Sequence, residues 1–319
     1  SYSVSRKTLL LEVAKCALAL RELGLDIGDR IAINMPNIPE QLFWTEACKR
    51  LGIVYTPVFG GFSDKTLSDR IHNAGARVVI TADGGYRNAQ IVAFKEAYTD
   101  PALDGYVPAE TVVEIVQRTL GELAVPAEQA RVILDGARTA VANEITLERS
   151  DVMRGVGRAI ESIGGLSSAE ASRIRTAIAS ALVATPARVD IVVVVRHAAQ
   201  ADLLWRPERD RWAHELTDRA EQKILAAARA AGHEVDSLAA LMALPDSQFV
   251  AAIWASSRPV PLDAEFPMFF IYTSGSTGKP KGVVHVHGGY LSGVSHTMRV
   301  AFDARAGDVM YVVADPGWI

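Results

Sequence analysis

The chain contains the stretch Tyr272-Thr-Ser-Gly-Ser-Thr-Gly-Lys-Pro-Lys-Gly282, which directly follows the apolar run 268–271. It combines three glycines, four Ser or Thr hydroxyls and two lysines. A strand that ends in such a loop presents backbone N–H groups, hydroxyls and ammonium groups to a polyphosphate. Glycine permits the positive φ angles that let several N–H groups converge on one anion. The stretch therefore predicts a nucleotide-phosphate-binding loop at the end of a strand.

The order of residues in this loop differs from that of a P-loop. A P-loop needs Gly, four residues and then Gly-Lys-Ser/Thr, whereas here Gly275 and the four residues that follow it are succeeded by Pro280. A flexible Gly/Ser/Thr linker is the other reading, but a linker needs neither Pro-Lys-Gly nor a strand that leads into it. The loop resembles the signature of the adenylate-forming superfamily, which contains acyl-CoA synthetases, peptide-synthetase adenylation domains and luciferases.

The bulk composition is that of an ordinary globular protein. Its 319 residues are 49% hydrophobic and 22% charged, enough for one large or two ordinary domains. A net charge of −4 gives no reason to expect nucleic acid or an anionic membrane as a partner. No targeting or membrane segment is apparent. Cys16 and Cys48 fall on apolar helical segments, which favours buried thiols in the cytoplasm over a disulfide.

Helical and strand patterns alternate through the first hundred residues. Short apolar strands between amphipathic helices predict an α/β fold with a mostly parallel sheet flanked by helices. Ligands of such folds bind beyond the carboxyl ends of the strands. Asp64 is expected to cap the third helix. Helices are expected at 8–23, 39–51, 64–74 and 85–98, and strands at 31–35, 53–58, 77–82 and 191–195.

Other segments resemble the acetyl- or propionyl-CoA synthetase branch of the same superfamily, and they occur in family order. The resemblance implies the N-terminal α/β domain of an adenylate-forming enzyme, incomplete here. The segments are Gly24–Glu40, Tyr55–Ser63, Ile80–Arg87, Trp205–Trp212 and Ala314–Ile319.

Residues from about Pro101 to Pro186 do not follow that pattern. Their spacing predicts four short helices, near 108–123, 127–142, 147–163 and 168–184. We expect a helical subdomain at 101–186, inserted between a first part of the synthetase core at 1–100 and a second part at 187–319. Its lack of catalytic clusters favours a docking or interdomain role. The interruption and the closing segment resemble the acyl-CoA synthetase module of propionyl-CoA synthases, which are fused multi-enzyme chains.

The resemblance implies roles for individual residues. Thr277 and Lys281 would be catalytic, and Mg²⁺ would bridge the phosphates, although no metal ligands form a local cluster. The ATP phosphates would contact Thr273, Ser274, Gly275, Ser276, Thr277, Gly278 and Lys281. Coenzyme A would contact Phe59, Gly60, Gly61 and Arg87, and the acyl pocket would include Trp318 and Ile319.

Several of these residues have an alternative, purely structural interpretation. Gly60-Gly61 can be only a turn, and Arg87 a surface charge. Gln90 stands where relatives often carry a second arginine, a departure that bears on recognition of the coenzyme A 3′-phosphate. His285 and His287 form an H-x-H pair that would share one face of a strand, but no third ligand completes a metal site.

The function that these observations favour is ligation. ATP would activate a short-chain carboxylate (3-hydroxypropionate, propionate or acetate) to acyl-AMP, which coenzyme A would convert to acyl-CoA. We expect the chain to be an N-terminal fragment of a multifunctional propionyl-CoA synthase, inactive alone. The C-terminal synthetase domain, a fused hydratase and an NADPH-dependent reductase would be its partners.

Two other readings stay open. The first is a non-catalytic interaction module, built on a synthetase-like scaffold with a helical docking insert. The second is a peptide-synthetase adenylation domain, which shares the loop. Phe59-Gly-Gly and Thr81-Ala-Asp favour the coenzyme A branch over that second reading.

Overall fold

The computed structural model describes residues 3–87, 90–98, 106–142, 144, 146–183, 189–200, 203–273, 281–312 and 314. The chain divides into two compact units. The sheet unit contains Ser1–Phe62, Ala76–Ala97 and Asp190–Ile319, and the helical unit contains Ser63–Gly75 and Tyr98–Val189.

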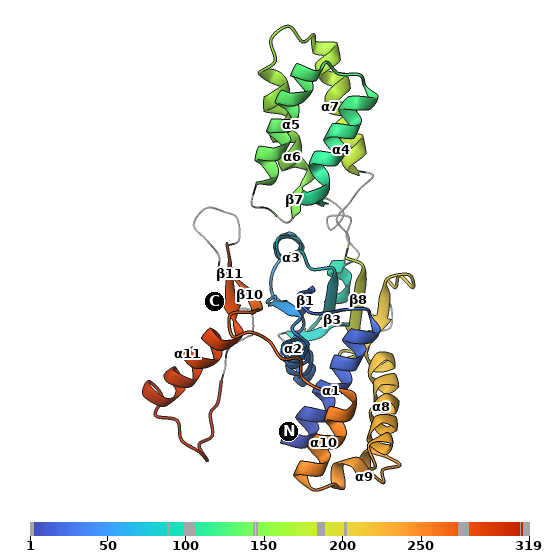
Figure 1. Cartoon of the computed structure of the whole chain (residues 1–319), viewed down its shortest axis with the longest axis vertical. Helices are drawn as coiled ribbons and strands as arrows, with labels where there is room; N and C mark the ends of the chain where they lie inside the picture. Colours follow the sequence, from blue (N-terminus) through green and yellow to red (C-terminus); the bar gives the residue numbers. More distant parts are fainter. Residues whose placement is uncertain are drawn as a thin grey trace. The chain divides into compact units, whose positions relative to one another are not determined.

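A seven-stranded sheet forms the centre of the sheet unit, with the strand order β11-β10-β2-β1-β3-β8-β9 (Figure 1). Every neighbouring pair is parallel except β10 and β11. The predicted α/β fold with a mostly parallel sheet is therefore confirmed. The strands are β1 (Arg30–Asn34), β2 (Val54–Pro57), β3 (Val78–Ala82), β8 (Ile191–Val195), β9 (Asp210–Trp212), β10 (Pro267–Thr273) and β11 (Lys281–Val286).

Helices flank this sheet. Among them α1 packs against α2, α8 and α10, and α8 and α10 also contact each other (Figure 1). The helix α2 ends at Gly52, which adopts the left-handed conformation (φ 71°) that favours glycine. The helices are α1 (Arg6–Glu22), α2 (Pro39–Leu51), α8 (Ala213–Ala230), α9 (Leu238–Ala243), α10 (Asp246–Ser256) and α11 (His287–Val300).

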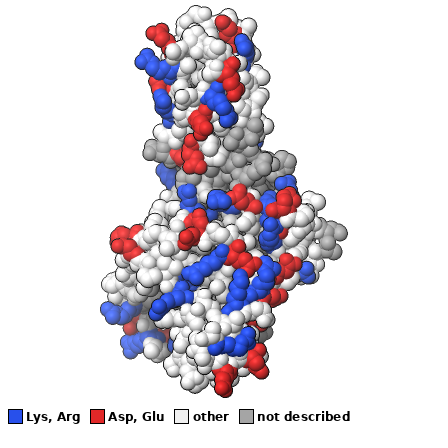
Figure 2. Space-filling view, turned by 45° about the vertical axis from the view of Figure 1, so that its right-hand side comes forward, with Lys and Arg blue, Asp and Glu red and all other residues white. Residues whose placement is uncertain are grey.

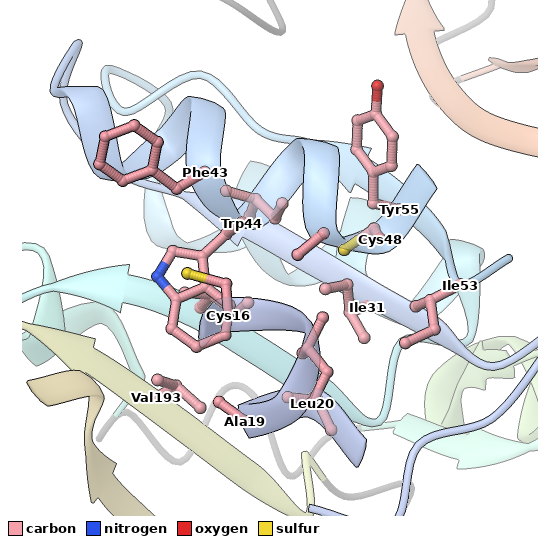
Figure 3. Close-up of a cluster of buried hydrophobic side chains, with 14 of the residues drawn as sticks. Cys16, Ala19, Leu20, Ile31, Phe43, Trp44, Cys48, Ile53, Tyr55 and Val193 are labelled. Atoms are coloured by element: carbon pink, nitrogen blue, oxygen red, sulfur yellow. The ribbon is translucent and has the colours of Figure 1, made fainter. Parts of the chain in front are cut away.

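The main core lies between α1, α2 and the sheet. Figure 3 shows Cys16 of α1 and Trp44 and Cys48 of α2 in one cluster with Ile31 of β1. Strands covered on both faces carry continuous apolar runs, as Ile191–Val195 does. Both cysteines are free and buried, as predicted, and burial raises the pKa of each thiol.

The helix predicted at 85–98 is wrong. Residues 85–87 and 90–92 pair as two antiparallel strands, β4 (Gly85–Arg87) and β5 (Gln90–Val92), and a 3₁₀ turn, η1, follows at Lys95–Tyr98. Tertiary packing overrides the helical spacing here. A Cβ on Gly85 would lie 2.9 Å from the Phe94 ring, and the Lys95 side chain is completely buried.

Two smaller expectations were also wrong. Ser63, rather than Asp64, caps α3 (Asp64–Ala74), because the Ser63 hydroxyl accepts the N–H of Thr66. His285 and His287 do not share a strand face, since β11 ends at Val286 and His287 begins α11. No group of three potential metal-ligating side chains occurs within the described residues.

Lys95 and Asp210 form a buried ion pair in the sheet unit. Lys95 Nζ lies 2.8 Å from Asp210 Oδ2, and both side chains are fully buried. The ammonium also donates to the Leu204 carbonyl, and Asp210 accepts from the Arg206 N–H and from Arg209 Nε. Burial lowers the pKa of Lys95, and the Asp210 carboxylate opposes this effect. The pair therefore joins the segment after β5 to the segment that leads into β9.

The helical unit contains the four helices that the spacing predicts, each within a few residues of the expected bounds (Figure 1). Tyr106 of β6 stacks on His72 of α3 and donates its hydroxyl hydrogen to Asp69. These contacts bind α3 into this unit. Its elements are α3, β6 (Tyr106–Pro108), α4 (Ala109–Glu122), α5 (Ala127–Val141), β7 (Thr146–Glu148), α6 (Arg149–Glu161) and α7 (Ser168–Val183).

The helical unit is built as two similar halves, a repeat that sequence analysis missed. Each half consists of a short strand followed by two helices, β6-α4-α5 and β7-α6-α7. The strands pair antiparallel around Val107 and Leu147. The helix α4 packs on α5 as α6 packs on α7, and α5 packs on α6 as α7 packs on α4. Buried positions of α4 recur 40 residues later in α6. They are Val112 and Val152, Val116 and Val156, and Leu120 and Ile160.

Acidic and basic side chains are interspersed over the face seen in Figure 2 rather than gathered by sign. None of the described helices is long and apolar enough to cross a membrane.

The buried ion pair predicts a large effect of removing one partner. Lys95→Met removes the ammonium from the buried Asp210 carboxylate and leaves Arg209 as its cation, so we expect the free energy of unfolding to fall by up to about 3–5 kcal/mol. Lys223→Met, which removes an exposed pair with Glu22, should cost less than about 1 kcal/mol. Urea denaturation of the two variants measures both changes. Equal effects would contradict this account of Lys95.

Two glycines of the helical unit predict opposite effects of alanine. A Cβ on Gly136 of α5 would lie 2.6 Å from the Ala159 Cβ, whereas a Cβ on Gly157 of α6 meets nothing within 4 Å. Gly136→Ala should therefore destabilise the protein by about 1–3 kcal/mol through overpacking. Gly157→Ala should stabilise it by about 0.5–1 kcal/mol through helix propensity. Denaturation followed by circular dichroism separates the two, and a stabilising Gly136→Ala would refute the close packing.

Candidate functional site

The predicted phosphate loop is held at both ends by the β10–β11 hairpin. Thr273, the last residue of β10, pairs with Lys281, the first residue of β11. The hairpin is joined to the rest of the sheet through β2, where Phe269 pairs with Tyr55 and stacks on its ring. Gly282 pairs with Tyr272, and a Cβ there would lie 3.0 Å from the Tyr272 ring. Glycine at 282 therefore lets the aromatic ring lie over the hairpin.

Of the predicted phosphate-binding residues, the structure describes the two at the ends of the loop. Thr273 is half-buried and Lys281 is exposed. An exposed ammonium beside the loop is available to an anion. Ser274, Gly275, Ser276, Thr277 and Gly278 lie outside the described residues, as do the predicted acyl-pocket residues Trp318 and Ile319.

The loop leaves the sheet at the end where ligands of α/β folds bind. Because β10 is parallel to β2, its carboxyl end lies at the same edge of the sheet as the carboxyl ends of β2, β3 and β8. The segments that follow these strands begin at Val58, Asp83 and Arg196. Ligands of parallel sheets bind beyond this edge. The sheet thus places Thr273 and Lys281, which flank the predicted phosphate loop, on the same side of the unit as the segment that follows β2.

A cavity of about 400 Å³ opens in this region. Three of the four predicted coenzyme A residues, Phe59, Gly60 and Gly61, line it. Arg87 is the last residue of β4, directly after the lining residue Tyr86; its side chain is outside the described part. The structure therefore brings the segment after β2 and the β4 hairpin to one cavity.

Gly60 also has a packing role. A Cβ at this position would lie 2.4 Å from the Phe94 ring, which is far too close for any larger residue. The glycine therefore lets Phe94 pack beneath the cavity. This finding supports part of the structural reading of Gly60-Gly61, and Phe94 itself lines the cavity.

Sequence analysis missed Tyr86, Phe94 and His197 as lining residues of this cavity. His197 belongs to the segment directly after β8. Its ring contacts the Tyr86 ring edge-on, with the two ring centroids 5.8 Å apart. Its position just beyond a buried parallel strand is the signal that could have identified it.

Asp83 holds the His197 segment in place. Its buried Oδ1 accepts three backbone N–H groups, from Gly84 at 2.7 Å, His197 at 2.8 Å and Ala198 at 2.9 Å. The Asp83 N–H in turn donates to the Val195 carbonyl. Accepting several N–H groups satisfies a buried carboxylate. Asp83 thus joins the ends of β3 and β8 at the point where both segments reach the cavity.

A second cavity, of about 560 Å³, lies on the other side of His197. Trp205 and Trp212 stack there with ring centroids 4.5 Å apart, and the Arg196 guanidinium lies 4.4 Å from the Trp212 ring centroid. Arginine stacked on an aromatic face in this way is held by cation–π attraction. The Arg196 side chain is therefore directed to the second cavity.

The histidines near the phosphate loop belong to an aromatic cluster. His285 stacks on Phe269 with centroids 4.5 Å apart and meets the edge of Tyr290. Burial lowers the pKa of the His287 imidazole. The backbone N–H of His287 donates to the Phe266 carbonyl. The described contacts give these residues a packing role beside β10.

Comparison with known proteins places the chain in a family. The family model described as AMP-binding enzyme matches residues 1–152 and 167–319. An acetyl-coenzyme A synthetase of Streptomyces coelicolor is 32% identical over 309 residues, which is 97% of this chain and 30% of that protein. Those of Streptomyces avermitilis and Pseudomonas putida (acetyl-coenzyme A synthetase 2) are each 30% identical, over 100% of this chain and 31% and 32% of their own lengths.

The chain spans about a third of the length of the curated relatives it matches. The family model nevertheless covers both flanks of the phosphate loop and all the residues that line the first cavity. The chain belongs to the AMP-binding enzyme family.

Proposed function

We propose that this chain supplies the ATP-phosphate and coenzyme A sites of an AMP-forming ligase that makes acyl-CoA from a short-chain carboxylate. The observation that carries the proposal is the β10–β11 hairpin. It holds both ends of the Gly/Ser/Thr loop, with Lys281 exposed, at the carboxyl-end edge of the sheet. The cavity lined by Phe59, Gly60 and Gly61 opens at the same edge.

The chemistry requires such an arrangement. A carboxylate is a poor acyl donor because its leaving group would be oxide, and adenylation replaces oxide by AMP. Negative charge moves between the α- and β-phosphates in that step, so fixed N–H groups and cations near the phosphates are the main requirement. Thr273 and Lys281 are the described residues that would contact them. The phosphates would carry Mg²⁺, as in phosphoryl transfer generally.

The substrate that we propose is a small acid. Acetate, propionate and 3-hydroxypropionate are the candidates, since the matched relatives bear the name acetyl-coenzyme A synthetase. The resemblance to propionyl-CoA synthase supports 3-hydroxypropionate. In that case a fused hydratase and an NADPH-dependent reductase would process the product.

We also propose that further chain completes the site with a C-terminal synthetase domain. The apolar side chains Val283, Val284 and Leu291 of β11 and α11 are exposed, and α11 has no buried residue. Such a surface suits coverage by more polypeptide. For the helical segment 101–186 we propose a docking role between domains, supported by a core of its own.

The phosphate site predicts the effect of removing its cation. In the full-length protein that carries this chain, Lys281→Ala should lower the rate of ATP–pyrophosphate exchange with acetate, propionate or 3-hydroxypropionate by roughly 100-fold, because it deletes a charge at the migrating phosphates. Lys223→Ala, an exposed lysine of α8 that pairs with Glu22, is the matched control and should leave the rate unchanged.

Two results would count against the proposal. If the unsubstituted protein catalyses no exchange with any small acid, the ligase function is wrong and the non-catalytic interaction module becomes the better description. If exchange occurs but Lys281→Ala behaves like Lys223→Ala, the phosphate site lies elsewhere.

A further inference from the structure

The described lining residues of the cavity beside Phe59 and Gly60 offer little positive charge. Its lining consists of glycines, apolar and aromatic side chains, Asn37 and His197. Among these described lining residues, His197 is the single side chain that can become cationic. A ligand with phosphate groups needs N–H donors or cations beside them, because an unpaired phosphate is costly to remove from water.

Two neighbouring residues do not fill this need within the described part. Arg196 lies over Trp212 and lines the second cavity rather than the first. Gln90 pairs with Arg87 across the β4–β5 hairpin and carries no charge. Among the described lining residues, the positive charge therefore has to come from the segment after β8.

His197 is placed to supply it. Its backbone is fixed by Asp83, so the residue stays at the cavity even though its side chain is exposed. In the described part of the chain, its ring nitrogens have no hydrogen-bond partner. The edge contact with Tyr86 holds the ring at the mouth of the cavity. An imidazole donates N–H to a phosphate oxygen and adds a positive charge when protonated.

We infer that His197 is a specificity-determining residue that binds the 3′-phosphate of coenzyme A at the mouth of this cavity, with Asp83 as the residue that positions it. The inference rests on the proposed function, which makes coenzyme A the ligand. Tyr86 and His197 stand at the exposed rim of the cavity. This rim suits the charged nucleotide end of coenzyme A, since phosphates are best placed near water.

Calorimetric binding to the full-length protein tests the inference with two ligands, coenzyme A and 3′-dephospho-coenzyme A, which differ by the 3′-phosphate alone. His197→Ala should weaken coenzyme A binding by roughly three- to tenfold, as expected for a partly exposed charge-assisted contact. Binding of the dephospho ligand should stay within about twofold, because it lacks the group that His197 contacts. The backbone N–H that Asp83 accepts is kept, so the variant should fold.

Two further variants sharpen the test. His197→Lys keeps a cation and should retain most of the preference for the 3′-phosphate. His296→Ala removes an exposed histidine of α11 away from this cavity and should leave both dissociation constants unchanged. Together they separate the loss of charge at the cavity from the loss of any imidazole.

The inference is overturned if His197→Ala weakens the binding of both ligands equally, because that result would indicate a packing role. It is likewise overturned if the variant weakens the binding of neither ligand. It is also overturned if the unsubstituted protein binds neither ligand. ATP–pyrophosphate exchange, measured on the same variants, requires no coenzyme A. Normal exchange with an unchanged preference for coenzyme A therefore refutes the role of His197 alone, whereas absent exchange refutes the proposed function.

Discussion

Parallel pairing of β2, β1, β3 and β8 is the constraint on which the rest of the sheet unit depends. Parallel strands end at a common edge, so every segment that leaves a strand there is brought near the others, however far apart they are in sequence. The Phe59–Gly61 segment, Gly85 and His197 meet for this reason. The antiparallel pairing of β10 with β11 adds Thr273 and Lys281, which flank the predicted phosphate loop, to the same edge.

Buried polar groups fix what the strands bring together. Asp83 accepts three backbone N–H groups, and Lys95 pairs with Asp210 in a fully buried setting. Such groups add little net stability over a well-packed apolar core, because desolvation offsets most of the attraction. Apolar packing has no direction, whereas a carboxylate with three donors defines one geometry for the chain. We infer that these residues chiefly specify where the cavity walls lie.

The sequence predicted the regular elements well where local signals agreed with packing. Pro39 begins α2 and Gly52 ends it, and the β-branched run Ile191–Val195 is β8. The prediction was wrong at 85–98, because Phe94 packs against Gly60 and Gly85 and Lys95 pairs with Asp210, which no local pattern reveals.

The candidate site was predicted in part for similar reasons. Phe59, Gly60 and Gly61 stand in a recognisable motif and line one cavity. His197 belongs to no motif, and its importance appears only when the edge of the sheet is assembled. The repeat in the helical unit escaped notice because its halves share buried apolar positions, such as Val112 and Val152, and few identical residues.

The place where the helical unit enters the chain explains how a sheet can tolerate it. The chain leaves the sheet unit first at Ser63–Gly75 and again after Ala97, and it returns at Asp190, directly before β8. The Asp190 N–H donates to the Arg77 carbonyl, and its carboxylate pairs with the Arg77 side chain at 2.7 Å. These two bonds set the register in which β8 joins β3, beginning at Val78 and Ile191. The pairing of β8 with β3 is therefore stabilised by contacts within the sheet unit itself. A long connection between the two strands costs only slightly more chain entropy than a short one.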